Sequence, residues 1–153
     1  FVRLYHGTAA VNPVLKEGLL PTTQRRRNSL HSSSGYVCLS VYPGMAHQFG
    51  MYASLNRPRD AQGRRVLVYP VVKTIGSLLA DRDQLSARRH WAGERLGDTL
   101  AESLVHGYGA RVRGAIEPQR LLAPLCLEEV RPLDEHVVQN GEDQAPRREK
   151  VVG

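Results

Sequence analysis

The chain has 153 residues, of which 41% are hydrophobic and 24% are charged, a composition typical of one globular domain. No apolar run approaches the roughly 20 residues that a membrane-spanning helix needs, the first residues lack the features of a signal peptide, and the cysteines have no zinc-binding spacing. Lys and Arg outnumber Asp and Glu by 21 to 15, for a net charge of +6, which indicates an anionic partner and no membrane partner.

The first part of the chain predicts two strands and one helix. Residues 2–6 mix apolar and polar side chains and predict a short strand closed by a turn at Gly7. Residues 11–20 have apolar side chains at helical spacing, with Gly and Pro stop signals at the end. Residues 24–34 are polar and predict a loop, after which the β-forming residues 36–41 predict a second strand.

The middle of the chain predicts a further helix and its best strand. Residues 45–55 predict the helix, and residues 56–63, with Pro, Arg, Asp and Gly, predict a loop. Residues 65–73 form a continuous apolar run, which predicts a central strand covered on both faces. Residues 77–83 predict a short turn or helical piece, and residues 84–96 are polar and rich in arginine.

Three short strands are predicted towards the end, over residues 102–106, 110–112 and 121–130. From about residue 134 the sequence becomes polar with few apolar anchors. We therefore expect one domain over residues 1–133 and a flexible tail over residues 134–153. Short strands mixed with short helices favour an α+β fold over a doubly wound α/β fold.

The two cysteines, Cys38 and Cys126, each lie within an apolar stretch. A free cysteine behaves as a small hydrophobic residue, so we expect both to be buried free thiols. Free thiols are typical of a reducing compartment, which predicts a cytoplasmic location.

The segment from Leu4 to Thr8, read as Leu-Tyr-His-Gly-Thr, carries the chemistry that we weigh most. A glycine such as Gly7 has no Cβ, so its peptide group can approach a flat amide ring closely. A histidine such as His6 can bind ribose hydroxyls while it remains neutral. This segment resembles the first-strand motif of the ADP-ribosyltransferase superfamily.

Further blocks follow in the order found in that superfamily, over about residues 2 to 122. They are Val14 to Leu19, Gly35 to Ser40, Ala46 to Gly50, Val66 to Val72, Ala101 to Val105 and Ile116 to Pro118. The resemblance implies a split β-sheet core with short flanking helices. It also implies NAD as the co-substrate and no metal.

The resemblance and the chemistry of NAD together suggest residues for binding the nicotinamide half. Phe49 or Tyr52, with Tyr36 as a third choice, are candidates to stack on the nicotinamide ring. The Gly7 backbone is the candidate for the ring amide. The candidates for the ribose are His6, which is also a candidate catalytic residue, with Thr8 or Ser40.

The remaining roles need charge. The consecutive arginines Arg25, Arg26 and Arg27 are candidates for the pyrophosphate. Glu102 is the first choice for the catalytic carboxylate, at the start of the strand predicted over residues 102–106, and Glu117 is the second.

The resemblance implies transfer of ADP-ribose to an anionic macromolecule, with nucleic acid favoured over protein. The Ala-Glu-x-Leu-Val block around Glu102 is similar to one in bacterial toxins that modify DNA bases, and the excess of basic residues agrees with a nucleic-acid target. Small domains of this kind resemble bacterial or phage toxins and effectors. Two alternatives stay open. The opening blocks also resemble the catalytic half of tRNA 2′-phosphotransferases, and the chain could be an inactive basic module that binds NAD or nucleic acid.

Overall fold

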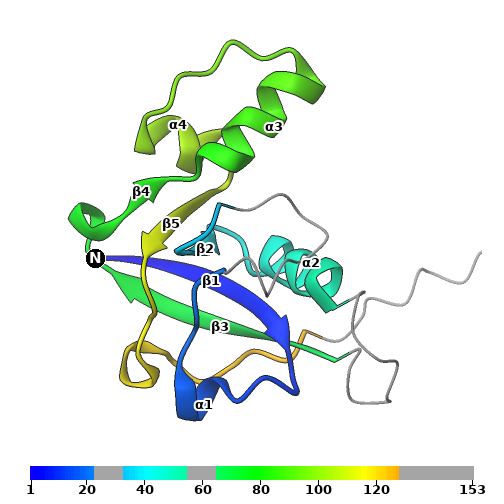
Figure 1. Ribbon diagram of the computed structural model, residues 1–153, viewed down its shortest axis with the longest axis vertical. Coiled ribbons are helices and arrows are strands. Elements are labelled where there is room, and N and C mark those ends of the chain that lie inside the picture. The colour runs from blue at the N-terminus through cyan, green and yellow to red at the C-terminus, as the bar shows by residue number, and fades with distance from the viewer. Residues whose placement is uncertain (23–32, 55–64, 128–153) are drawn as a thin grey trace, which may run out of the picture.

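The computed structural model describes residues 1–22, 33–54 and 65–127 (Figure 1). These residues form a mixed α+β fold around a five-stranded antiparallel sheet with the order β3-β1-β2-β5-β4. The strands are β1 (Val2–Ala9), β2 (Tyr36–Ser40), β3 (Val66–Lys73), β4 (Leu79–Ala80) and β5 (Gly109–Arg113). The predicted α+β class is therefore confirmed.

The sheet consists of two halves that are joined at a single residue pair. β1 and β3 pair along their whole length, from Val2 opposite Lys73 to Ala9 opposite Val66. β2 and β5 also pair along their whole length. Between β1 and β2, the register holds only Tyr5 opposite Ser40. The strands on either side of this junction are thus firmly held, while the junction itself is narrow.

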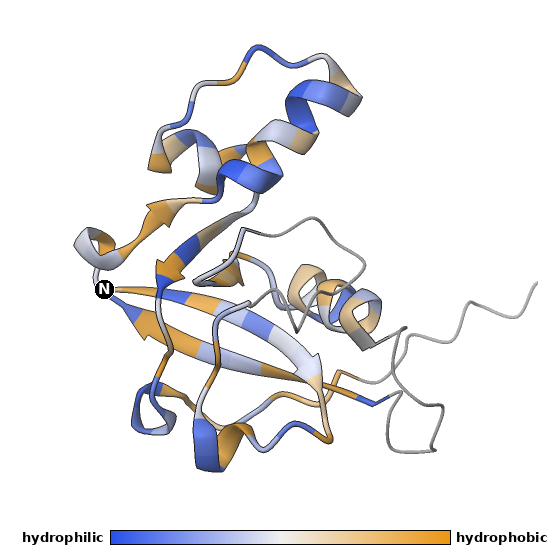
Figure 2. Cartoon of the chain, viewed as in Figure 1, coloured by the Kyte–Doolittle hydropathy of each residue, from blue (hydrophilic) through white to orange (hydrophobic). Residues whose placement is uncertain are grey.

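The helices cover different parts of the sheet (Figure 1). α2 (Pro43–Ser54) packs against β1 and β3, whereas α4 (Leu100–Val105) packs against β4, β5 and α3 (Arg82–Ala92). α1 (Val14–Glu17) lies beside η3 (Pro118–Arg120), and η2 (Ile75–Ser77) precedes β4. Figure 2 shows that α3 is hydrophilic along most of its length, while the strands carry much of the apolar sequence.

The main core lies on the sheet face away from α2. Val37 and Leu39 of β2 alternate with Tyr36, Cys38 and Ser40, so the two sets point to opposite faces. Only the first set belongs to the buried apolar cluster. That cluster comprises Leu4, Val14, Leu19, Val37, Leu39, Tyr69, Val71, Leu78, Ala110, Val112 and Ile116. The opposite face of β2 and β5 therefore carries polar and aromatic side chains.

The prediction that residues 65–73 form a central strand is wrong in its position. β3 is the outermost strand of the ladder, although Leu121 and Leu125 cover its outer edge with isolated bridges. Pro70 explains the position, because it has no N–H to donate and is tolerated where no neighbouring strand requires one. The run remains buried since α2 and the core cover its two faces.

Three other predicted elements differ in extent. β1 continues through Gly7 to Ala9, where we expected a turn at Gly7, because β3 supplies a partner for every residue. The predicted helix over residues 11–20 is reduced to the four residues of α1, since Leu19 leaves the helix to bridge Ile116. The described part of the strand predicted over residues 121–130 has only isolated bridges.

Two predictions on local environment are also wrong. Residues 102–106, predicted as a strand, lie mostly in α4, because Thr99 and Glu102 form a capping box that starts a helix. Cys126 is exposed, since it lies beside the outer edge of β3 and outside the core, while Cys38 is half-buried; both are free thiols.

The strands predicted over residues 36–41 and 110–112 and the helix over residues 45–55 are confirmed as β2, β5 and α2, with small shifts of their ends. None of the helices within the described ranges is both long and apolar enough to cross a membrane. The predicted tail over residues 134–153 lies outside the described residues.

Candidate functional site

Hydrogen bonds at the outer edge of β3 fix the direction of the Gly7 peptide group. Val68 both donates to and accepts from Leu125, at 3.0 and 2.7 Å, so its N–H and C=O point away from β1. Val68 lies opposite Gly7 in the register. Such a pair in an antiparallel ladder exchanges no hydrogen bonds. The N–H and C=O of Gly7 therefore point towards β2.

The ladder between β1 and β2 ends one step before Gly7. Tyr5 pairs with Ser40, and a continued ladder would next pair Gly7 with Cys38. Within the described residues that pair is not formed. The sheet thus has a gap in its ladder here, with the peptide group of Gly7 on one side and Cys38 on the other.

His6 bridges this gap in its neutral form. Its Nδ1 lies 2.8 Å from the carbonyl oxygen of Cys38. Because a carbonyl oxygen can only accept, Nδ1 carries the proton and the Nε2 of a neutral ring is an acceptor. Burial lowers the pKa of His6, and the bond to Cys38 offsets this only in part. A half-buried, neutral imidazole with one acceptor nitrogen is suited to accept a hydrogen bond from a hydroxyl.

The Cα of Gly7 faces α2, on the side of the sheet opposite to His6. A Cβ at this position would lie 1.8 Å from the carbonyl oxygen of Ala46. Gly50 fits in the same way, because its Cβ would lie 2.8 Å from the carbonyl carbon of Gly7. We expected glycine here for the approach of a ligand, and the structure adds a second reason, which is the close packing of α2 on β1.

The hydroxyls of Thr8 and Ser40 have local partners. The buried Thr8 accepts from the amide of Asn12. Ser40 Oγ donates to the carbonyl oxygen of Tyr108 at 3.2 Å and accepts from the backbone N–H of Tyr42 at 3.3 Å. Ser40 lies at the junction of the two halves of the sheet, so its nearest role is to hold the turn before β5 against the end of β2.

The aromatic candidates lie on two different elements. Phe49 is half-buried and Tyr52 is exposed, and both belong to α2, which covers the face of β1 opposite to His6. Tyr36 begins β2, and the guanidinium of Arg111 lies over its ring, 4.1 Å from the centroid. One face of the Tyr36 ring is therefore already occupied.

Glu102 lies far along the sheet from His6. It belongs to α4, which packs on β4 and β5, and β2 lies between these strands and β1, which carries His6. Its carboxylate accepts from the N–H of Gly97 at 2.9 Å and from the hydroxyl of Thr99 at 2.8 Å. These bonds lower the pKa of Glu102. The exposed Glu117 precedes η3, beside α1.

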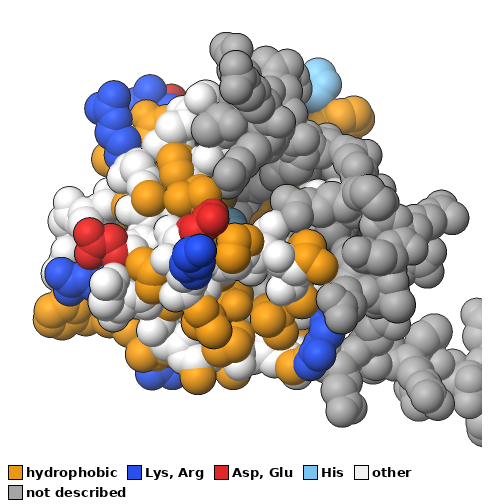
Figure 3. All heavy atoms as spheres, turned by 60° about the horizontal axis from the view of Figure 1, so that its bottom comes forward, with side chains coloured by type: hydrophobic (Ala, Val, Ile, Leu, Met, Phe, Trp, Pro, Cys, Tyr) orange, Lys and Arg blue, Asp and Glu red, His pale blue; other side chains and the backbone are white. Residues whose placement is uncertain are grey.

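Arg25, Arg26 and Arg27 lie outside the described residues. The basic residues that are described do not gather on the underside of the molecule, where α1 and η3 lie. Figure 3 shows that hydrophobic side chains spread over this face and that Lys and Arg side chains stand singly. In the described ranges, no group of His, Cys, Asp and Glu side chains could hold a metal ion.

Sequence reasoning missed two residues that the topology brings to the site. Cys38 supplies the carbonyl oxygen for His6, and Arg111 lies opposite Cys38 in the register of β2 and β5. A signal for Arg111 existed in the strand predicted over residues 110–112, where one arginine interrupts an apolar run. The partner of His6 had no local signal, because it is a backbone group on another strand.

Tyr108 was missed as well. Its φ of 53° is in the left-handed region, which a bulky residue rarely adopts. Its carbonyl oxygen accepts from Ser40 and from the N–H of Val41, and Arg88 lies 5.3 Å from the ring centroid. Backbone strain of this kind is common near functional sites, and here it lies beside the junction of the two halves of the sheet.

No protein-family model matches this chain, and a search of curated proteins finds no similar sequence.

Proposed function

We propose that the chain is an NAD-dependent ADP-ribosyltransferase that binds the nicotinamide half of NAD at the gap between β1 and β2. The observation that carries this proposal is the break in the β1–β2 ladder at Gly7, beside a neutral His6. A primary carboxamide has one acceptor and two donor hydrogens on neighbouring atoms. It can therefore pair with the N–H and C=O of Gly7 as Cys38 of β2 would in a continued ladder.

The fit extends to the ribose. The Nε2 of His6 accepts a hydrogen bond from a ribose hydroxyl while Nδ1 stays on Cys38. His6 and Gly7 are adjacent in β1, which is held by β3 and by α2. Groups on such a rigid strand keep their positions better than groups on a loop do.

NAD, when bound, supplies the ADP-ribosyl group. The bond from the ribose carbon to the nicotinamide nitrogen breaks, nicotinamide leaves with the electron pair, and an acceptor atom forms the new bond to the same carbon. The acceptor must lose a proton to a base. Glu102 remains the proposed carboxylate for that step, although α4 packs on β4 and β5, away from His6. A nucleic acid remains the favoured acceptor, since the chain carries a net charge of +6.

The binding half of the proposal is tested by calorimetric titration of NAD⁺ into the wild type and His6→Ala. Loss of one neutral hydrogen bond is expected to weaken binding by about three- to tenfold. His90→Ala is the matched control, because His90 is exposed on α3, and it should bind as the wild type does. Equal affinity of wild type and His6→Ala at equal stability would remove His6 from the site.

Turnover is tested with NAD⁺ labelled in the adenosine half and, separately, in the nicotinamide ring, incubated with nucleic acid or protein. Adenosine label on a macromolecule identifies a transferase and its acceptor. Free nicotinamide without transfer indicates cleavage with the acceptor missing. No turnover, despite binding, would favour the RNA 2′-phosphotransferase alternative or a binding module, and a 2′-phosphorylated RNA substrate separates these two.

Glu102 needs a pair of variants, since its carboxylate also caps α4. Gln can replace Glu in a capping box, so Glu102→Gln is expected to preserve α4 while it removes the charge. Loss of turnover in Glu102→Gln with unchanged NAD⁺ binding would support the catalytic role. Full activity in Glu102→Gln would assign the residue to the helix cap alone.

A further inference from the structure

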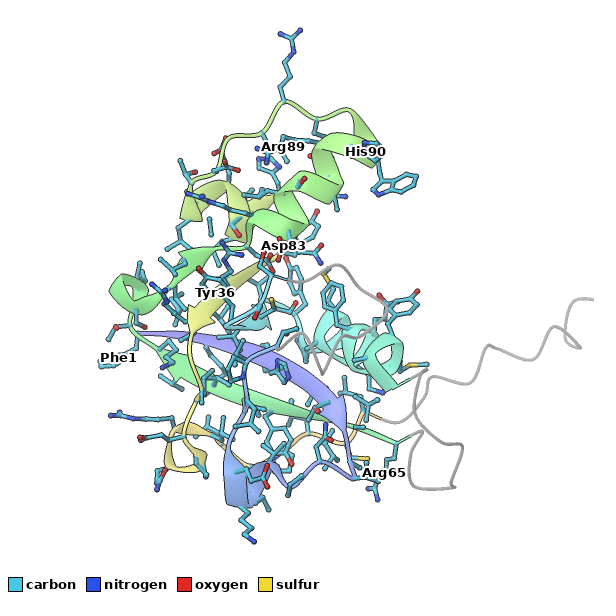
Figure 4. The ribbon with its side chains drawn as sticks, viewed as in Figure 1. Phe1, Tyr36, Arg65, Asp83, Arg89 and His90 are labelled. Atoms are coloured by element: carbon cyan, nitrogen blue, oxygen red, sulfur yellow. The ribbon has the colours of Figure 1, made fainter. Side chains whose placement is uncertain are left out.

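Arg111 is a buried cation on the polar face of β5. Its residue is 8% exposed, and it lies opposite Cys38 in the register. The Tyr36 ring covers one face of its guanidinium at 4.1 Å. Figure 4 shows Tyr36 and Asp83 close together, where β5 approaches the start of α3. A buried arginine normally spends its five N–H groups on hydrogen bonds.

The hydrogen bonds of Arg111 are incomplete. Its Nε and Nη1 are buried and have no hydrogen-bond partner among the described residues. The nearest carboxylate oxygen, Oδ2 of Asp83, lies 3.7 Å from Nη1, which is too long for a hydrogen bond. That carboxylate is instead bound by the backbone N–H and the hydroxyl of Ser33, at 2.7 and 2.8 Å.

The neighbouring groups do not supply the missing acceptor. Burial raises the pKa of the Cys38 thiol, and Asp81 and Asp83 raise it further, so this thiol stays neutral beside Arg111. Asp81 is buried, and its carboxylate accepts from the N–H of Gln84 at the start of α3. The Nε–H of Arg111 therefore has no carboxylate acceptor among the described residues.

We propose that Arg111, held against Tyr36, binds a phosphate group through the Nε side of its guanidinium. The planar fork of arginine matches phosphate oxygens, and a stacked aromatic ring fixes its plane. Such a phosphate comes either from the pyrophosphate of a dinucleotide or from a nucleic acid.

The phosphate site lies near the proposed NAD site in the sheet but does not depend on it. β2 lies between β1 and β5, so Arg111 is two strand spacings, about 10 Å, from the β1 edge. Cys38 connects the two places, because its carbonyl oxygen binds His6 and its residue lies opposite Arg111. The two side chains nevertheless point to opposite faces of the sheet, because His6 alternates with Tyr5, which pairs with Ser40 on the face that carries Cys38 and Arg111.

The first test is binding of inorganic pyrophosphate to the wild type, Arg111→Gln and Arg111→Lys. Loss of a charged hydrogen bond is expected to weaken binding by about 10- to 100-fold in Arg111→Gln, and Arg111→Lys should retain part of it. Arg113→Gln is the matched control, because Arg113 is exposed on the same face of the same strand. Equal pyrophosphate binding by Arg111→Gln and the wild type would overturn the proposal. Binding of acetate to the wild type as tight as that of pyrophosphate would overturn it as well.

The second test separates a binding role from a structural one. Arg111→Lys keeps a positive charge beside Asp83, and Nε and Nη1 make no hydrogen bonds to lose, so Arg111→Lys is expected to unfold close to the wild-type temperature when no ligand is present. A large fall in its unfolding temperature would overturn the proposal and assign Arg111 to the fold.

The source of the phosphate is identified with ADP-ribose and with a short single-stranded oligonucleotide, compared between wild type and Arg111→Gln. The ligand that loses affinity in the variant is the source, and a loss for neither overturns the proposal. His6→Ala is measured in parallel. If pyrophosphate binding depends on Arg111 but NAD⁺ does not bind, the phosphate site stands and the proposed NAD function fails.

Discussion

Replacement of Gly7 by alanine should disrupt the packing of α2 on β1. The added Cβ would lie 1.8 Å from the carbonyl oxygen of Ala46 and 2.5 Å from its carbonyl carbon. Carbon–oxygen contacts in proteins are normally about 3.3 Å or longer, so the overlap is about 1.5 Å. The obstacle is helix backbone, which cannot rotate away as a flexible side chain can, and α2 must shift as a unit.

Overpacking of a core typically costs about 1–3 kcal/mol and sometimes more. A backbone clash of this size belongs at the upper end, so we expect Gly7→Ala to lose about 3 kcal/mol of unfolding free energy. For a chain of this length, that corresponds to a fall of about 6–12 °C in the unfolding temperature. Thermal unfolding followed by circular dichroism measures this directly.

Gly44→Ala is the matched control for Gly7→Ala. Gly44 lies in α2 itself, and a Cβ there would meet nothing within 4 Å. Alanine is favoured over glycine in a helix by about 0.5–1 kcal/mol, so this variant should unfold at a slightly higher temperature than the wild type. A Gly7→Ala protein within about 2 °C of the wild type would refute the packing argument and return Gly7 to a role in ligand approach alone.

Three further outcomes are expected. Burial lowers the pKa of His6, so as the pH falls the unfolded chain binds a proton at His6 before the folded chain does. The stability conferred by the neutral ring is therefore complete above about pH 6.5, and it is lost as the pH falls from there through the lowered pKa of the folded state. Urea unfolding at pH 7.5 and 5.0 should therefore show a smaller loss for His6→Gln than for the wild type, and equal losses would contradict the burial argument. Thr99→Ala should lose about 1 kcal/mol with its helix cap, whereas Thr74→Ala should not, since the Thr74 side chain caps nothing. Iodoacetamide should label the exposed Cys126 and spare Cys38 in the folded protein, because burial raises the pKa of the Cys38 thiol; labelling of Cys38 in peptide mass spectra would contradict this.

Elements with strong local signals could be predicted from the sequence. The apolar and β-branched runs of β2 and β3 and the helical spacing of α2 indicate their type without any tertiary contact. The position of β3 in the sheet was misjudged from the length of its apolar run. Pro70 within that run carried the better information, since proline favours an edge position.

The helices α3 and α4 show where apolar periodicity fails and capping chemistry succeeds. In α3 only Leu85 is buried, so the apolar pattern is too weak to identify a helix. Its ends are nevertheless marked, by Asp81 accepting from Gln84 and by Gly93 in the left-handed conformation. The Thr-x-x-Glu spacing of Thr99 and Glu102 likewise marks the start of α4.

In the candidate site, too, some residues could be predicted from the sequence and others could not. His6 and Gly7 could be singled out from a short motif, because their chemistry is local. The partner of His6 could not, since the carbonyl oxygen of Cys38 reaches it only through the pairing of β1 with β2. The side chain of an alternating strand also points to one face only, which separates Tyr36 and Arg111 from the apolar core on the other face.

The gap in the ladder is itself the strongest reason to look for a ligand there. β1 is fixed by its pairing with β3 and by α2, and β2 is fixed by β5. The junction at Tyr5 and Ser40 brings the two strands into hydrogen-bonding register. A continued ladder would therefore pair the peptide groups of Gly7 and Cys38 without any inserted residue. His6 already donates to the Cys38 oxygen that the N–H of Gly7 would use in such a ladder. Peptide groups left unpaired within a sheet cost stability unless another partner binds them. A neutral imidazole lies beside this break in the ladder, and the absence of a Cβ at Gly7 lets α2 pack closely on the strand there. An amide ligand bound at the break would supply the partners that the ladder does not provide.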